Sequence, residues 1–199
     1  MSITDTSRFE RALQKFDAVN AEDPHTEIIN GVAYPKELVY AQRMTACLQR
    51  IAPDASEALQ LAVRCQHIRR WEISRQDYPV GLQGYNKWRN TLKKYHAEIA
   101  GNILREVGYD ADTIARVEFL VQKRQLKIDA EVQLLEDIIC LVFLEYYFID
   151  FARQHPVEKV VDILQKTWPK MTPQGQQLAL QLNLPDEARD LIGIALGAG

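Results

Sequence analysis

The sequence lacks a long hydrophobic run, a secretory leader and an excess of charge of one sign. Its most apolar stretch, Ile138 to Ile149, is interrupted by Glu145 and flanked by Asp137 and Asp150. That stretch falls well short of the roughly 20 residues that a membrane-spanning helix requires. The N-terminal segment "MSITDTSRFERALQKF" is charged throughout and has no apolar core of the kind a secretory signal carries. These absences predict a cytoplasmic protein with no membrane partner.

The chain also lacks an excess of cations over anions, and its cysteines are few. The formal net charge is −3 and the pI is about 5.8, which argues against binding of nucleic acid through bulk positive charge, because neutralising many phosphates requires many clustered cations. The net charge does not exclude a local basic patch. The three cysteines, Cys47, Cys65 and Cys140, form no C-x-x-C pair and lie in apolar contexts, which is typical of buried reduced thiols.

The local signatures of several enzyme classes are absent. The chain has no G-x-G-x-x-G, G-x-x-x-x-G-K-[ST], H-E-x-x-H or G-x-S-x-G motif, which are the patterns of dinucleotide, P-loop, zincin and serine-hydrolase sites. The paired E-x-x-H motifs of a di-iron bundle are missing as well. What is present is a chain of ordinary globular composition, with 199 residues of which 47% are hydrophobic and 26% are charged.

Helical periodicity runs through nearly the whole chain. Apolar residues recur three and four positions apart, and no alternating strand of useful length separates the periodic segments. The stretch "NAEDPHTEIINGVAYPK" is expected to be a loop with a short turn at Asn30-Gly31. We therefore predict an all-α fold, a single-domain helical bundle over residues 1–199 with its core from about 8 to 196.

A predicted helix from about Ala130 to His155 carries two candidate carboxylates. It is apolar on all sides between Ile138 and Ile149, the pattern of a helix that runs through a core. Glu145 lies in that run and must be partnered, because an isolated buried charge costs several kcal/mol. It is either a structural ion-pair member or a catalytic carboxylate in a pocket. Asp137 shares the face of Leu141 and either points inward or marks a solvated helix entrance.

Two histidines are predicted to point inward from separate helices. His67 lies near the end of a predicted helix from about Ala55 to Arg70, and His96 lies on the apolar stripe of a later helix. Cationic residues at the end of a helix also suit its dipole, which is the structural alternative for His67. An inward histidine is usually a satisfied core residue, but two of them in separate helices also fit a shared pocket. The candidate catalytic residues are His67, His96, Asp137 and Glu145.

Arginines near "QHIRRW" predict phosphate binding, because the guanidinium fork binds phosphate in two-point geometry. Arg43, Arg69 and Arg70 are the candidate phosphate-binding residues, and Trp71 beside them is suited to clamp a nucleotide or an RNA base. The other basic residues either add to this pocket or form solvated faces; they are Lys93, Lys94, Lys123, Arg124 and Lys127.

Four blocks of the sequence carry a resemblance to a known family. "KELVYAQRM", "QHIRRWEI", "YHAEIAGNILREVGYD" and "LEDIICLVFLEYYF" together resemble the family catalogued as domain of unknown function 4202. The resemblance covers nearly the whole chain, from about Arg8 to Leu196. It implies a fold but no activity.

The order of these blocks is also similar, more remotely, to the HD-domain metal-dependent phosphohydrolases. In that resemblance Tyr40 stands where a first His is expected, Gln66-His67 replaces the His-Asp dyad, and Asp137 falls at the final Asp. The resemblance implies a divalent metal held by His67, His96 and Asp137, with Glu98 or Glu136 as replacement ligands. Because the dyad Asp and the first His are absent, a degenerate, metal-free site is the alternative.

Two functions follow from these residues. The first is an HD-like hydrolase of a phosphorylated small molecule or nucleotide, in which the histidines and Asp137 hold a metal or transfer protons while the arginines neutralise the phosphate. The second is a non-catalytic module that binds a phosphorylated ligand or, less favourably, RNA. The sequence leaves the substrate and the oligomeric state open.

Overall fold

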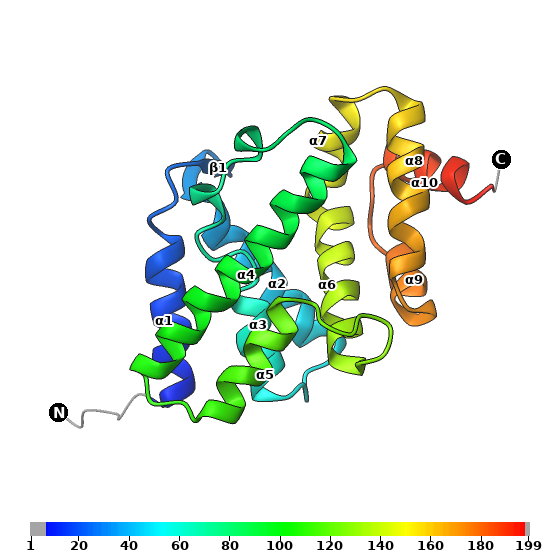
Figure 1. Cartoon of the computed structure of the whole chain (residues 1–199). Coiled ribbons are helices and arrows are strands. Elements are labelled where there is room, and N and C mark those ends of the chain that lie inside the picture. The colour runs from blue at the N-terminus through cyan, green and yellow to red at the C-terminus, as the bar shows by residue number, and fades with distance from the viewer. Residues whose placement is uncertain (1–6, 198–199) are drawn as a thin grey trace. The chain divides into compact units, whose positions relative to one another are not determined.

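The computed structural model describes residues 7–197 and separates the chain into two compact units, which meet in sequence between Arg124 and Gln125. Each unit is built almost entirely of helices (Figure 1). The all-α prediction is therefore confirmed. The extent of a single domain over residues 1–199 and the HD-like arrangement stay predictions.

Three helices of the first unit begin at side chains that cap them. Ser7 accepts a hydrogen bond from the Glu10 amide while Glu10 bonds back to the Ser7 amide, and Ser56 and Asp110 cap two further helices. The elements are α1 (Arg8–Asn20), α2 (Lys36–Ile51), α3 (Glu57–Arg64), α4 (Leu82–Glu106), α5 (Ala111–Val121) and the 3₁₀ turns η1 (Arg70–Glu72) and η2 (Arg75–Asp77).

The core of the first unit forms where these helices meet. α5 packs on α3 and α4, and α2 packs on α1 and α3. The largest fully buried side chains here are Phe16, Met44, Leu48, Leu59, Leu61, Ile68, Leu104 and Leu120. This core holds the start of α2, the end of α3 and the middle of α4 close together.

A short antiparallel hairpin precedes α2, where a loop was predicted. Its strands are β1 (Thr26–Ile29) and β2 (Val32–Pro35), and the turn residues Asn30 and Gly31 have φ of 51° and 80°. Positive φ at both central positions is the requirement of the tight turn that Asn-Gly favours. The turn was predicted correctly, but strands of four residues are too short to show a clear alternation.

The helix predicted from about Ala55 to Arg70 ends earlier, at Arg64. Arg69 has a φ of 52°, which a continuing helix does not allow. Tertiary hydrogen bonds replace helical ones here: the Arg69 amide donates to Asn20 Oδ1 at 3.4 Å, and the Ile68 carbonyl lies 2.7 Å from His96 Nδ1. Residues 65–69 therefore form a turn that projects alternate side chains in different directions.

The second unit is organised around α6. Its elements are α6 (Ala130–Tyr146), α7 (Phe148–Arg153), α8 (Val157–Thr167), the 3₁₀ turn η3 (Trp168–Lys170), α9 (Pro173–Leu180) and α10 (Asp186–Leu196). The helix predicted to reach His155 breaks at Tyr147, whose φ is −125°. Leu135, Ile138 and Leu141 are almost completely buried, as the apolar run predicted. Across residues 7–197, no helix combines the length and the apolarity that crossing a membrane demands.

Candidate functional site

The turn Gln66–Arg70 is the centre of a polar cluster in the first unit. α2 contributes Glu37 and Tyr40 from its first turns, and α4 contributes Trp88 and His96 from its inward face. Glu37 and His96 are only 8% and 2% exposed. A polar cluster this deeply buried needs a compensating set of interactions.

Glu37 lies between a histidine and an arginine. Its Oε2 is 3.4 Å from His67 Nδ1 and its Oε1 is 3.8 Å from Arg70 Nε, while its amide donates to Asp23 Oδ2 at 2.9 Å. Burial raises the pKa of the Glu37 carboxyl to about 7; Arg70 opposes this shift and Asp23 adds to it. Glu37 therefore changes protonation near neutral pH.

His67 stacks on a tyrosine beside Glu37. The rings of His67 and Tyr40 are 4.1 Å apart with an interplanar angle of 10°, and 23% of the His67 side chain remains exposed. Burial lowers the pKa of His67 well below its usual range, and the charges of Arg70, Lys123 and Arg89 lower it further. His67 is therefore neutral at physiological pH and has three cations around it.

His96 is the most deeply buried group of the cluster. Its Nδ1 is 2.7 Å from the Ile68 carbonyl oxygen, and its ring lies 5.9 Å from that of His67. Burial, followed by the neighbouring His67, lowers the pKa of His96 to about 3. The prediction that both histidines point inward and lie near each other agrees with this geometry, whereas their catalytic role stays a prediction.

The two consecutive arginines point to different partners. Arg70 places its guanidinium 4.8 Å from the Trp88 ring centroid and reaches Glu37. Arg69 instead lies 3.6 Å from Glu22 and 3.7 Å from Glu72. The aromatic partner of Arg70 is thus Trp88 and not the adjacent Trp71.

Arg43, the third predicted phosphate-binding residue, is engaged elsewhere. It donates to both carboxylate oxygens of Glu27 on β1, at 3.0 and 2.6 Å. This two-point ion pair ties α2 to the hairpin. Of the three predicted arginines, Arg70 contacts Glu37 in the cluster, whereas the guanidinium of Arg69 pairs with Glu22 and Glu72. The phosphate-binding role of all three stays a prediction.

Five buried side-chain atoms have no hydrogen-bond partner among residues 7–197; they are Asn20 Nδ2, Glu37 Oε2, Gln66 Oε1, Arg69 Nε and His96 Nε2. Gln66 and Arg69 belong to the turn itself, and the other three residues each contact it. Buried polar atoms in folded proteins are nearly always hydrogen-bonded, to protein or to ordered water. These five atoms therefore leave several hydrogen bonds unmade within the protein, on the turn and on the residues that contact it.

Asp137 is fully engaged within the second unit. Its carboxylate accepts from the Thr172 amide at 2.8 Å and the Thr172 hydroxyl at 2.5 Å, and Gln133 lies 3.4 Å away. Thr172 is the residue that caps α9. Asp137 thus anchors the start of α9, a role that its inward position on α6 allowed but did not reveal. A catalytic role for Asp137 stays a prediction.

Glu145 is less buried than its place in the apolar run suggested. It is of intermediate exposure, whereas Glu136 and Asp137 are the buried carboxylates of α6. The catalytic role of Glu145 also stays a prediction.

The predicted metal ligands His67, His96 and Asp137 each have other contacts within their own unit. Both oxygens of Asp137 are hydrogen-bonded inside the second unit, and His96 uses Nδ1 on a backbone carbonyl. In the described part of the chain, no group of three or more His, Cys, Asp and Glu side chains is placed to hold a metal ion. The metal site stays a prediction, and the reaction proposed below uses no metal.

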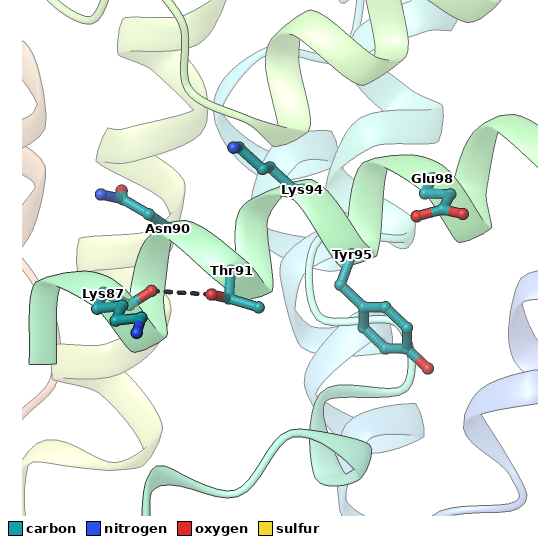
Figure 2. Close-up of a pocket in the computed structure, with 6 residues that line it drawn as sticks. All are labelled: Lys87, Asn90, Thr91, Lys94, Tyr95 and Glu98. Atoms are coloured by element: carbon teal, nitrogen blue, oxygen red, sulfur yellow. Dashed lines mark hydrogen bonds between the residues drawn. The ribbon is translucent and has the colours of Figure 1, made fainter. Parts of the chain in front are cut away.

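Figure 2 shows a different feature of the first unit, an open hollow along α4. The Thr91 hydroxyl donates to the Lys87 carbonyl at 3.1 Å, and the Tyr95 hydroxyl donates to Glu72. None of the five unsatisfied atoms belongs to a lining residue, and Lys87 and Lys94 are exposed. This hollow therefore fits a solvated face better than a binding site. The lining residues are Lys87, Asn90, Thr91, Lys94, Tyr95 and Glu98.

Glu37 is the main residue of the cluster that the sequence analysis missed. In the sequence it follows Pro35 as an ordinary acidic residue of a first helical turn, which suits the helix dipole. A signal was nevertheless present, because Glu37 lies four and seven positions before Ala41 and Met44, on the buried stripe of α2. A carboxylate on such a stripe requires a partner.

Comparison with known proteins adds a family to this geometry. No curated protein and no solved structure matches the chain. A family model matches residues 10–192, and thus includes both units and all residues of the polar cluster. The resemblance to the HD-domain phosphohydrolases stays a prediction. The resemblance to the family of unknown function is confirmed over most of the sequence, and the chain belongs to the family described as Domain of unknown function (DUF4202).

Proposed function

We propose that the Gln66–Arg70 turn binds a small phosphorylated ligand and that Glu37 transfers a proton in the hydrolysis of its phosphate ester. The observation that carries this proposal is the set of five buried polar atoms without partners, all on the turn or on residues that contact it. A ligand with several polar atoms, or water that it displaces, satisfies such a set.

The charge around the turn favours a phosphate group. Arg70, Lys123 and Arg89 all act electrostatically on His67, which is itself neutral. The Arg70 guanidinium is held against Trp88 and is only loosely paired with Glu37, at 3.8 Å. A phosphate that approaches His67 therefore meets three cations, and Arg70 exchanges a long contact for a short charge-assisted hydrogen bond.

Glu37 is suited to move the proton. With a pKa of about 7 it is partly ionised and partly protonated at neutral pH, the condition in which one group both accepts and donates efficiently. In the proposed step a water oxygen attacks phosphorus and the ester P–O bond breaks. One water proton passes to the Glu37 carboxylate and then to the leaving alkoxide, so the products are an alcohol and inorganic phosphate.

A second candidate function is non-catalytic binding of the same class of ligand, with RNA as a less favoured partner. It is favoured by the lowered pKa values of both histidines, because neither His67 nor His96 is protonated near pH 7 to serve as a general acid. In this alternative Glu37 only orients Arg70.

The test measures phosphate release and binding with matched variants. Purified protein is incubated with a panel of sugar phosphates and nucleoside monophosphates, and inorganic phosphate is quantified. Glu37→Gln is expected to lower the rate by at least about 100-fold, the lower end of general acid-base contributions, while ligand affinity changes little. Release by neither protein, with binding retained, would support the binding module instead.

Arg70→Ala and Arg69→Ala form the matched pair for the binding half of the proposal. Because Arg70 reaches Glu37 and His67 while the Arg69 guanidinium pairs with Glu22 and Glu72, Arg70→Ala is expected to weaken phosphate affinity much more than Arg69→Ala. The expected loss is about 1.5–3 kcal/mol, the scale of a hydrogen bond to a charged group. Equal affinities in both variants, measured by calorimetric titration, would refute this binding site.

A further inference from the structure

We infer that the ligand of the Gln66–Arg70 turn carries, besides its phosphate, a hydroxyl or N–H group that donates a hydrogen bond to His96 Nε2. This inference rests on the proposed function and specifies its ligand class. It predicts sugar phosphates or nucleotides, and it disfavours simple phosphates without a donor.

The tautomer of His96 follows from its geometry. Its Nδ1 lies 2.7 Å from the Ile68 carbonyl oxygen, which only accepts hydrogen bonds. Nδ1 therefore carries the proton, and in a neutral imidazole the other nitrogen is then an acceptor. The side chain is 2% exposed, and burial keeps the ring neutral. Nε2 is thus an acceptor in a fixed position.

No group of the described chain donates to this acceptor. His96 Nε2 is buried and lacks a hydrogen-bond partner. The two neighbouring polar rings have other contacts, because His67 Nδ1 faces Glu37 and the Tyr95 hydroxyl donates to Glu72. An unmade bond at a buried acceptor is unfavourable, because the atom has given up its hydrogen bonds to water. A donor from outside the chain removes this cost.

A fully ionised phosphate is the wrong partner for Nε2. Its oxygens are acceptors, and an acceptor beside Nε2 leaves both atoms unsatisfied. The cations that act on His67 suit the phosphate instead. We therefore expect the anionic part of the ligand to bind at Arg70 and the part that carries the hydrogen-bond donor to bind at His96.

The experiment compares ligands that differ in donors, at pH 8, where phosphate monoesters with a second pKa near 6 are dianions. Methyl phosphate has no donor, whereas ribose 5-phosphate and adenosine 5′-monophosphate have hydroxyl groups. Calorimetric titration of the wild type is expected to give at least about tenfold tighter binding of one or both donor-bearing ligands, as one well-made hydrogen bond supplies. Equal affinity for all three would overturn the inference.

Two variants of His96 isolate the acceptor. In His96→Asn the amide nitrogen takes the place of Nδ1 and keeps donating to Ile68, while the atom at Nε2 is lost. In His96→Gln the amide oxygen lies near the position of Nε2 and accepts in its place. The preference for donor-bearing ligands over methyl phosphate is expected to disappear in His96→Asn and to return in part in His96→Gln. Thermal unfolding checks that each variant is folded.

The outcomes separate this inference from the function on which it rests. If methyl phosphate binds and Arg70→Ala weakens it, but ligand preference is the same in wild type and His96→Asn, the inference is wrong and the phosphate site stands. If none of the three ligands binds the wild type, the phosphate site and the inference both fail. If His96 Nε2 bonds only to a buried water molecule, the first of these outcomes is expected, and donor-bearing ligands bind no more tightly than methyl phosphate.

Discussion

At the scale of the residue, Glu37 combines an ordinary sequence position with an unusual environment. The folded protein raises its pKa from 4.5 to about 7, mainly through burial. The folded state therefore binds more protons than the unfolded state between these values, so this group makes stability fall as pH rises from 4.5 to 7. The loss of folding stability from ionised Glu37 is therefore complete above pH 7 and absent below pH 4.5.

This sign leads to a prediction for Glu37→Gln, which cannot ionise. Relative to wild type, the variant is expected to be more stable at pH 8, by on the order of 1–3 kcal/mol, and no more stable at pH 4. Urea unfolding at the two pH values measures the difference. Loss of stability at pH 8 would show that the ionised carboxylate holds the fold together through Arg70 and His67.

At the scale of the element, α9 depends on a close approach between a glycine and a carboxylate. Gly175 lies in the first turn of α9, and its amide donates to the Thr172 hydroxyl at 2.9 Å. A Cβ added at Gly175 would lie 2.7 to 2.9 Å from the carboxylate atoms of Asp137. Asp137 cannot move away easily, because Thr172 holds both of its oxygens.

We therefore expect Gly175→Ala to destabilise the protein by about 1–3 kcal/mol, the usual cost of overpacking. Gly193→Ala is the matched control, because Gly193 lies inside α10 and its added Cβ meets nothing within 4 Å. The control is expected to gain about 0.5–1 kcal/mol from helix propensity. Denaturant unfolding compares the two, and equal effects would contradict the anchoring role of Asp137.

At the scale of the whole molecule, the two buried histidines govern the response to acid. Burial lowers the pKa of His96 to about 3 and that of His67 well below 6.5. The unfolded chain binds more protons at both positions once pH falls below 6.5, so stability is lost on acidification. Glu37 has the opposite effect on stability between pH 4.5 and 7, because its pKa is raised. We expect the two histidines together to outweigh this single carboxyl group.

The melting temperature is accordingly expected to fall as pH decreases from 6.5 towards 4. In His96→Asn the fall should be shallower, because Asn takes up no proton in either state. Thermal unfolding across this range, with the wild type and the variant at each pH, measures both slopes. Parallel curves would mean that folding does not lower the pKa of His96.

The sequence by itself determined the features that depend on neighbours along the chain. Helical periodicity predicted the all-α class, and the run from Ile138 to Ile149 predicted a buried helix, because a helix surrounded by others must be apolar on every face. The Asn30-Gly31 turn was predicted from positive-φ preference. Element ends were less accurate, as at Arg64 and Tyr147, because tertiary contacts and not local propensity stop those helices.

Only the tertiary structure decided which polar residues meet. Arg69 and Arg70 are adjacent in sequence, yet the positive φ at Arg69 sends one to Glu22 and Glu72 and the other to Glu37. His96 is joined to the turn through Ile68, 28 residues earlier. Hydrogen bonds and burial act through space, and a sequence pattern records only what lies within a few residues. The inward histidines were therefore predictable. The buried stripe of α2 indicated that Glu37 requires a partner, but only the tertiary structure showed that its partners are His67 and Arg70.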